Sequence, residues 1–308
     1  MGLDLLDTPV RLSWHFAPEA PLSRADLLRI AGGLAEGGVF FLYLDGRPLL
    51  HPHFAEMLDI LAEKGIRISL VSGGSPAEFR ALQPGLPLAQ LDIEIIDRSG
   101  FSGAVLRRIL EDVRERGYDP GLLLRPRASR LPLLPELLTT ARELGVNRVR
   151  LPNLPLDGEE APRNSAELPG PKDLERLRRS LIPGCAAGLP LEIHDLFIWE
   201  LFHDDDGAQR AEYGGCQAGN SLGHVDAAGN LHPCASWPGA FGSLLEYSLE
   251  DLWASPARFR VREEVEQVPP GCRGCAGYDL CFGGCRGLSR SFDPHGDGRD
   301  PLCAGLRR

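Results

Sequence analysis

Seven of the eight cysteines of this chain lie between residues 216 and 303, and the first 184 residues contain none. Four of the seven follow one another with the spacing C-x2-C-x5-C-x3-C. Closely spaced thiolates are soft ligands that hold iron–sulfur clusters or tetrahedral zinc. The sequence therefore predicts a metal centre near the C-terminus, with the candidate ligands Cys216, Cys234, Cys272, Cys275, Cys281, Cys285 and Cys303.

The predicted location of the protein bears on the choice between ligands and disulfides. The chain opens with an acidic segment that lacks the basic region of a secretory signal, and no run of 18 apolar residues predicts a membrane span. We therefore expect a cytoplasmic protein, in which cysteines at ligand spacing are metal ligands rather than disulfides. Iron–sulfur ligation is the favoured interpretation, and structural zinc is the alternative. The net charge of −10 argues against a general nucleic-acid binder.

The residues before the cysteines alternate between strand and helix patterns. Strands are expected at residues 9–16, 39–44, 67–71, 91–96, 121–125, 146–151 and 191–194. Helices are expected at 24–37, 52–64, from 76, 102–116, 134–144 and 171–181. This alternation implies parallel βαβ units, and six units predict an α/β fold with a partial (β/α)6 barrel. A doubly wound sheet is the alternative, but no G-x-G-x-x-G follows the first strand.

The remaining segments suggest two domains, a barrel at 1–199 and a cysteine-rich domain at 200–308. Residues 152–170 are rich in Pro, Gly, Asn and Glu and predict a surface loop, and 200–215 reads as a linker. In the second domain, residues 224–233 predict a β-hairpin that turns at 228–230. Ser248 and Asp251 have the spacing of a capping box, which predicts a short helix carrying Trp253.

The cysteine-rich region resembles a SPASM domain, the cluster-binding extension of peptide-modifying radical SAM enzymes. The family pattern is C-x9-15-G-x4-C, followed by C-x2-C-x5-C-x3-C and a final cysteine, and this chain has Gly229 at the glycine position. The resemblance implies two [4Fe–4S] clusters. One would be held by Cys272, Cys275, Cys281 and Cys303, and the other by Cys216, Cys234 and Cys285.

The fourth ligand of the second cluster is left open by the sequence. Many SPASM proteins carry a further cysteine where this chain has Arg210. The alternatives are His203, one of Asp204–Asp206, the distant Cys185, or an exchangeable site without a cysteine. The simpler interpretation makes Cys185 a buried thiol and the aspartate run a solvated linker. The histidines are expected to be structural or surface residues, namely His194, His203, His224 and His232.

The barrel region resembles the radical SAM fold but departs from it where that family binds its cofactor. Family members carry C-x3-C-x2-C in the loop after the first strand, whereas residues 17–23 contain no cysteine. Their Gly-Gly-Glu-Pro signature, which contacts the amino group of S-adenosylmethionine, corresponds here to residues 45–48, with Arg47 in place of the glutamate. We therefore expect no S-adenosylmethionine site, no radical SAM activity and no catalytic residue.

The whole pattern resembles the companion SPASM-domain proteins of GeoRSP-type peptide maturation systems. This resemblance implies a non-catalytic iron–sulfur partner of a radical SAM/SPASM maturase, which relays electrons or assembles the complex. One alternative is a module that holds the precursor peptide, where the acidic residues 157–160 would favour a basic peptide unless they form a solvated loop. Another is an enzyme that uses an open cluster iron as a Lewis acid. Neither a nucleic acid nor a membrane is expected as a partner.

Overall fold

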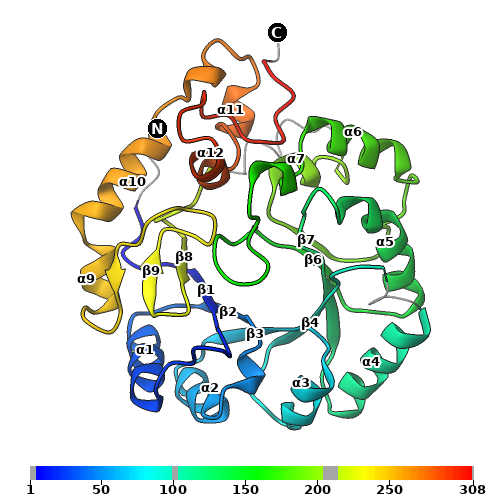
Figure 1. Cartoon of the computed structure of the whole chain (residues 1–308), viewed down its shortest axis with the longest axis vertical. Helices are drawn as coiled ribbons and strands as arrows, with labels where there is room; N and C mark the ends of the chain where they lie inside the picture. The colour runs from blue at the N-terminus through cyan, green and yellow to red at the C-terminus, as the bar shows by residue number, and fades with distance from the viewer. Residues whose placement is uncertain (1–4, 99–102, 204–213, 307–308) are drawn as a thin grey trace.

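The structure is a computed structural model that describes residues 5–98, 103–203 and 214–306. Its centre is a ten-stranded sheet with the order β10-β9-β8-β1-β2-β3-β4-β5-β6-β7. The sheet curves into an open ring with helices outside it (Figure 1). The parallel strands are β1 (Arg11–His15), β2 (Phe41–Asp45), β3 (Arg67–Ser72), β4 (Gln90–Glu94), β5 (Pro120–Leu123), β6 (Val149–Leu151) and β7 (Leu191–Ile193). The predicted α/β class and partial barrel are confirmed.

Successive residues of β1 alternate between the hydrophobic core and the inside of the ring. Leu12 and Trp14 are 0% and 1% exposed and belong to the hydrophobic core. Arg11 and Ser13 also line a cavity on the inside of the ring. Because successive strand residues point to opposite faces, one side of β1 packs in the core while the other presents polar groups to the interior.

The barrel helices form where the sequence predicts them, because their capping residues and their apolar faces mark the same residue ranges. The Oγ atom of Ser23 accepts a hydrogen bond from the backbone of Asp26 at the start of α1 (Arg24–Glu36). Ser75 and Glu78 form a capping box at α3 (Pro76–Ala81). The other barrel helices are α2 (Phe54–Glu63), α4 (Gly103–Glu115), α5 (Leu134–Glu143) and α6 (Pro171–Ser180). Within the described ranges, no helix has the length and apolar character needed to cross a membrane.

The cysteine-rich region continues the barrel sheet. Strand β8 (Leu222–Val225) pairs in parallel with β1 and forms the predicted hairpin with β9 (Asn230–His232), which in turn pairs with β10 (Gly242–Ser243). The predicted capping box begins α9 (Leu249–Trp253). The remaining elements are α7 (Leu196–Trp199), α10 (Pro256–Glu266), η5 (Pro270–Cys272), α11 (Tyr278–Cys281) and α12 (Arg286–Phe292). The proposed boundary at residue 199 therefore divides one continuous sheet.

The segment 152–170 is only partly the surface loop that its composition predicts. Its first half crosses the centre of the ring (Figure 1). Leu154 is 1% exposed, and its carbonyl oxygen accepts a hydrogen bond of 2.6 Å from the hydroxyl of Ser236. The backbone N–H of Leu156 donates to the carbonyl of Ala235. Composition alone misses this placement because the polar residues of the loop find their partners inside the barrel rather than in water.

Candidate metal centre and barrel cavity

Four of the predicted ligands line one cavity near the C-terminus, namely Cys272, Cys275, Cys281 and Cys303. Cys272 ends the turn η5, and Cys281 ends α11. Burial, followed by the charges of the neighbouring Cys281 and Cys303, raises the pKa of Cys272 to about 11. Thiolates this close together disfavour one another's charge unless a cation or cluster lies between them. We call these four residues the distal cysteine group.

The other three predicted ligands line a larger cavity inside the barrel, and we call Cys216, Cys234 and Cys285 the inner cysteine group. Burial raises the pKa of Cys234 to about 12, and the charge of Cys216 adds to the shift. Burial, followed by Asp300 and the other two thiols, raises the pKa of Cys285 well above its usual range.

A sharp reversal of the backbone separates the two groups. Phe282, Gly283 and Gly284 all have positive φ angles, of 49°, 84° and 67°. A Cβ atom on Gly284 would lie 2.5 Å from a carboxylate oxygen of Asp300, so this position requires glycine. The reversal sends Cys281 to the distal group and Cys285 to the inner group, although only three residues lie between them.

The donor sets fit an iron–sulfur cluster and also fit zinc. All eight cysteines lie among the described residues, and none is in a disulfide. Across the described ranges no three His, Cys, Asp or Glu side chains converge at metal-ligand spacing, so the two groups are defined by the cavities that they share. Their chemistry, four soft thiols in one place and three in another, is that of cluster ligands.

Two residues that the sequence analysis missed hold the groups in place. Arg262 of α10 is 2% exposed and donates hydrogen bonds to the carbonyl oxygens of Cys216 and Ala218. Asp300 is 4% exposed and accepts hydrogen bonds from the backbone N–H groups of Cys285 and Leu302. Asp300 thus ties the inner group to the chain beside Cys303. Neither residue stands in a cysteine motif, so only the tertiary contacts reveal them.

Replacing Asp300 by asparagine is expected to reduce the pH dependence of stability. Burial raises the pKa of Asp300 to about 6, above the value of about 3.9 for an unfolded chain. The folded protein therefore holds a proton that the unfolded chain has released, and the free energy of unfolding falls as pH rises from about 4 to about 6, by about 2 kcal/mol from this group. Urea unfolding of the purified protein across this pH range measures how steeply the free energy of unfolding changes with pH. The exposed Asp279→Asn variant is the control, and equal slopes for Asp300→Asn and the unaltered protein would contradict the assignment.

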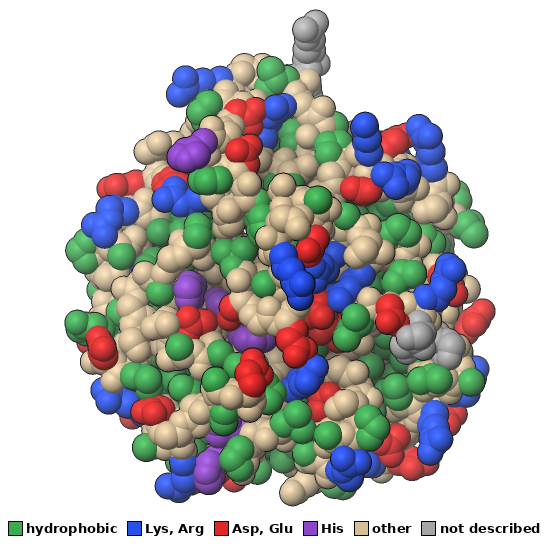
Figure 2. Space-filling model, viewed as in Figure 1, with side chains coloured by type: hydrophobic (Ala, Val, Ile, Leu, Met, Phe, Trp, Pro, Cys, Tyr) green, Lys and Arg blue, Asp and Glu red, His purple; other side chains and the backbone are tan. Residues whose placement is uncertain are grey.

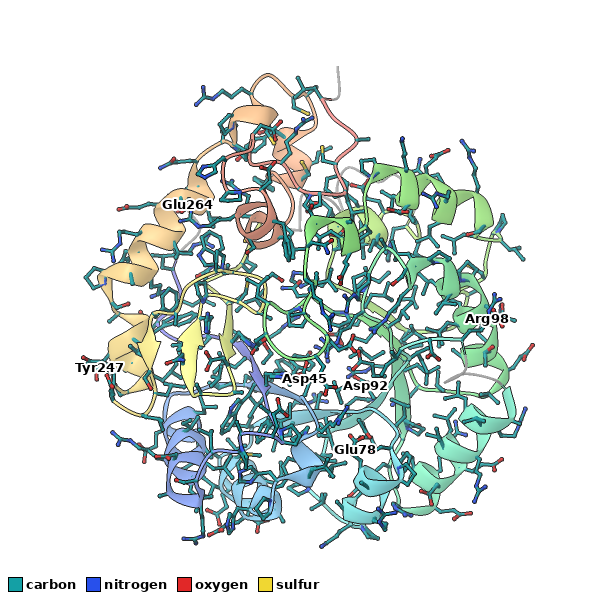
Figure 3. The ribbon with its side chains drawn as sticks, in the orientation of Figure 1. Asp45, Glu78, Asp92, Arg98, Tyr247 and Glu264 are labelled. Carbon is teal, nitrogen blue, oxygen red and sulfur yellow. The ribbon has the colours of Figure 1, made fainter. Side chains whose placement is uncertain are left out.

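Buried ion pairs lie at the carboxyl ends of several barrel strands, beside the barrel cavity. Nδ1 of His15 lies 2.6 Å from one carboxylate oxygen of Asp45, and Arg125 donates to the other at 2.7 Å. Arg125 also donates to Glu94 at 2.8 Å. Burial by itself would raise the pKa of Asp45, but Arg125 and His15 outweigh it and hold that pKa well below its usual range. Asp45 and Asp92 both lie inside the ring (Figure 3).

The loop that crosses the ring places its acidic residues beside these ion pairs at the carboxyl ends of the strands. Asp157 lies 3.1 Å from Nε2 of His224, Glu159 pairs with Arg47 at 2.7 Å, and Glu160 pairs with Arg130 at 2.6 Å. Figure 2 shows acidic and basic side chains gathered together at the centre of this face. The prediction that residues 157–160 form a solvated acidic loop holds only in part, because Glu159 is 70% exposed whereas Asp157 and Glu160 are half-buried and paired within the protein.

Solved structures share the fold. SuiB of Streptococcus suis, in its structure bound to S-adenosylmethionine, matches with a TM-score of 0.69 and 15% identity over 98% of this chain and 78% of that chain. The structure of anSMEcpe with bound AdoMet and a peptide matches with a TM-score of 0.63 and 13% identity, over 93% and 92% of the two chains. At these identities the likeness concerns the fold alone.

A family model matches the cysteine-rich part of the chain, and sequence relatives match most of its length. The model for SPASM, an iron–sulfur cluster-binding domain, matches residues 216–276. PqqA peptide cyclase of Gluconobacter oxydans is 23% identical over 303 residues, which cover 92% of this chain and 82% of the relative. The cyclase of Ruegeria pomeroyi is 25% identical over 283 residues, covering 87% and 75%. Residues 216–276 thus match the SPASM domain, and the chain is similar to radical SAM/SPASM proteins over most of its length.

Three segments of this protein meet where the resemblance places the radical SAM signatures. A Cβ atom on Gly46 would lie 2.0 Å from the carbonyl oxygen of Phe16, and one on Gly158 would lie 2.3 Å from the ring of His15. The segment after β1, the segment after β2 and the crossing loop therefore pack directly against one another. Arg47, at the position of the family glutamate, has a left-handed backbone with φ of 65°.

The structure locates two of the alternatives for the fourth ligand of the inner cysteine group. The ring of His203 stacks on Trp199 with centroids 3.9 Å apart, and Cys185 lines neither cysteine cavity. Asp204–Asp206 and Arg210 lie outside the described residues. His194 lines the barrel cavity together with the inner cysteine group. These placements leave Asp204–Asp206 and an exchangeable position that faces this cavity as predictions for the fourth ligand.

One of the predicted histidines forms a pair within the hairpin, and two others line the barrel cavity. His232 lies 3.1 Å from Asp226 within the hairpin, as expected of a structural residue. His224 lies between Ser13, at 2.7 Å, and Asp157. Burial, followed by Arg11 and Arg150, lowers the pKa of His194 to about 4, so this ring is neutral near pH 7. His194 and His224 both line the cavity, which their spacing in the sequence did not indicate.

Proposed function

We propose that the protein is an iron–sulfur accessory protein without radical SAM activity, which works beside a radical SAM/SPASM maturase. The observation that carries the proposal is the contrast between the two ends of the molecule. Seven cysteines line two cavities in and beside the SPASM region. The loop after β1 has no cysteine, and ion pairs and the crossing loop lie beside it at the strand ends.

The ligand assignment in this proposal follows the two cysteine groups. The distal group would hold one [4Fe–4S] cluster with four thiolates, and the inner group would hold three corners of a second. Such clusters supply one-electron transfer or rigid structure. The protein itself would bury Cys234 and Cys272, and it would orient Cys216 through Arg262 and Cys285 through Asp300. Docking onto a maturase would then use the clusters for electron relay or for assembly.

The test is the metal content of protein purified without oxygen, together with an assay for S-adenosylmethionine cleavage. We expect about eight irons with matching sulfide per chain, little zinc, and no 5′-deoxyadenosine after addition of S-adenosylmethionine and dithionite. About one or two zincs with little iron would make the region a structural zinc fold and would overturn the proposal. Formation of 5′-deoxyadenosine by the isolated protein would overturn the claim about the barrel.

A second candidate function is binding of a precursor peptide, with the clusters in a structural role. The barrel cavity of about 350 Å³ favours it, because this volume is within the range of ligand sites. SuiB has been solved bound to its precursor peptide SuiA, and the sequence relatives are peptide cyclases. An enzyme that uses an open iron at the inner group is the third candidate, since the same cavity reaches those thiols. A ligand that perturbs the cluster's spectrum would favour this third candidate, whereas a redox response to a maturase favours the accessory role.

A further inference from the structure

The barrel cavity has a polar end that the cysteines do not explain. Besides the inner cysteine group, the cavity is lined by side chains of β1, β2, β6 and β7, including Arg11, Tyr43, Arg150, Glu192 and His194. These residues come from strands that are far apart in the sheet order, so only the curvature of the ring brings them to one space. Arg11 is exposed, which connects this end of the cavity to solvent.

One of its arginines is buried and incompletely paired. Arg150 is 8% exposed, and its ion pairs are long, 3.8 Å to Asp92 and 3.3 Å to Glu192. Both carboxylates are held more closely by Arg148, at 2.8 Å and 3.0 Å. The buried Nε of Arg150 is the atom that lies 3.3 Å from Oε1 of Glu192, and among the described residues it meets no acceptor in hydrogen-bond geometry. Burying a guanidinium with an unmet donor is costly, so this group is well placed for an additional acceptor.

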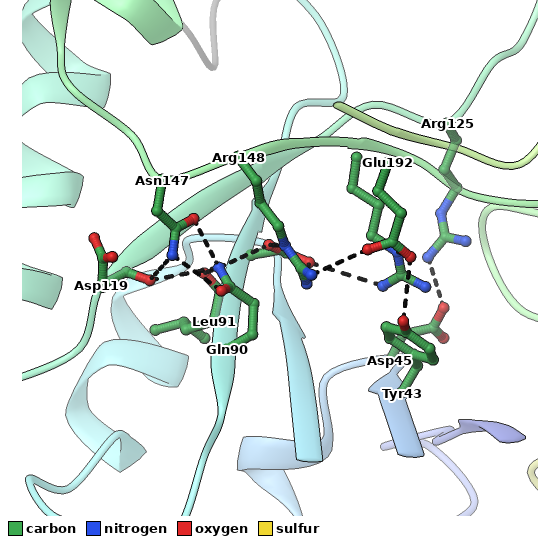
Figure 4. A network of polar contacts seen from close by, with 11 residues as sticks. Tyr43, Asp45, Gln90, Leu91, Asp119, Arg125, Asn147, Arg148 and Glu192 are labelled. Carbon is green, nitrogen blue, oxygen red and sulfur yellow. Dashed lines mark hydrogen bonds and ion pairs between the residues drawn. The ribbon is translucent and has the colours of Figure 1, made fainter. Parts of the chain in front are cut away.

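The surroundings hold the Arg150 guanidinium in a fixed orientation. Its central carbon lies 3.7 Å from the centroid of the Tyr43 ring, so a cation–π contact helps to hold the group in place. The Tyr43 hydroxyl donates to Glu192, and Glu192 in turn pairs with Arg148 (Figure 4). This chain of contacts fixes the wall on which Arg150 lies.

A second arginine adds positive charge that the protein does not neutralise. Within the described ranges no carboxylate forms an ion pair with Arg11, although it lines the same cavity as Arg150. The third arginine of the lining, Arg125, is already paired with Asp45 and Glu94. The available positive charge therefore lies at the end formed by Arg11 and Arg150.

We infer that the Arg11–Arg150 end of the cavity binds a carboxylate of a peptide, such as a glutamate side chain. A guanidinium fork matches a carboxylate in geometry and charge. Glu192 and Asp45 line the same cavity and would repel a doubly charged phosphate more than a singly charged carboxylate. The inference deepens the peptide-binding candidate under the proposed function and reverses its expected charge, since the acidic loop residues are paired and the arginines are available.

The test measures binding of two matched peptides by calorimetry to protein of known iron content. The probes are acetyl-Gly-Glu-Gly-amide and acetyl-Gly-Gln-Gly-amide, which differ in the carboxylate alone. The glutamate peptide is expected to bind about tenfold more tightly, the size of one charge-assisted contact. Arg11→Gln should remove most of this preference. Arg67→Gln is the matched control, because Arg67 is also the exposed first residue of a barrel strand but lies outside the cavity lining.

The outcomes separate this inference from the proposed function. Equal binding of the two peptides, equal effects of Arg11→Gln and Arg67→Gln, or absence of binding at millimolar concentration would each overturn the carboxylate site. Binding of free glutarate but of neither peptide would overturn the peptide as the source of the carboxylate. Iron analysis of the same samples tests the cluster proposal independently, because neither arginine belongs to a cysteine group.

Discussion

Replacing Cys272 and Cys275 together by serine is expected to lower the iron content from about eight to about four per chain, since one [4Fe–4S] cluster loses two of its ligands. Replacing Cys216 and Cys234 together should produce the same loss from the other cluster. The two double variants are distinguishable because the clusters lie in different surroundings, one in the small distal cavity and one in the barrel cavity. Iron and sulfide analysis, with electron paramagnetic resonance of the reduced protein, gives the measurement.

The control for this experiment is Cys185→Ser, because Cys185 lines neither cysteine cavity. It should retain all of the iron. Loss of all iron from either double variant would show that the seven cysteines form one interdependent site rather than two groups. Loss of iron from Cys185→Ser would make Cys185 the missing ligand and would contradict the exchangeable position proposed for the inner group.

The single variants Cys281→Ser and Cys285→Ser extend the test to the backbone reversal. In sequence these two cysteines are close neighbours, but the positive φ angles at residues 282–284 direct them to different cavities. Each of the two substitutions should therefore change the spectrum of a different cluster. Identical changes would contradict the assignment of these two residues to separate groups.

Replacing Arg125 by methionine is expected to destabilise the fold by about 3–5 kcal/mol, the cost of breaking a buried ion pair from one side. Arg125 is 4% exposed, and its removal leaves the carboxylates of Asp45 and Glu94 without their shared cation. Chemical denaturation, compared with the unaltered protein, measures the change. If Arg125 instead served only to bind a ligand, the free energy of unfolding would stay the same.

A surface ion pair provides the matched control for Arg125→Met. The side chain of Arg98 is 75% exposed, pairs with Glu136 and lies at the outer edge of the ring (Figure 3). Arg98→Met should cost less than about 1 kcal/mol, because exposed ion pairs contribute little. Adding Asp45→Asn and Glu94→Gln to Arg125→Met should restore part of the lost stability, since these changes remove the unpaired charges. A lack of recovery would attribute the loss to packing rather than to charge.

The repeating elements of the barrel could be predicted because they depend on local patterns. Val39 to Leu44 is a short apolar run bounded by glycines, and the strand β2 forms there as Phe41–Asp45. Ser248 has the spacing of a capping box in the sequence, and it caps α9 in the structure. Caps, apolar periods and turn residues act between neighbours in the chain, so the sequence contains the information that decides them.

The cavity could not be predicted, because its residues come from separate strands. Arg11, Tyr43 and Arg150 lie at unremarkable positions in the sequence, and their convergence depends on how far the sheet curves. The same reason applies to Asp300, whose contact with Cys285 spans fifteen residues. It also applies to residues 152–160, whose polar composition predicts exposure but whose ion pairs place them across the ring.

The sequence by itself determined which residue types are present for metal chemistry and which are missing. The spacing of the seven cysteines and the lack of any cysteine in residues 17–23 are properties of the chain. Only the tertiary structure decided which ion pairs lie at the strand ends and where positive charge is left unpaired. The physical reason is that ligand type is a local chemical property, whereas burial and electrostatic pairing depend on contacts between distant parts of the chain.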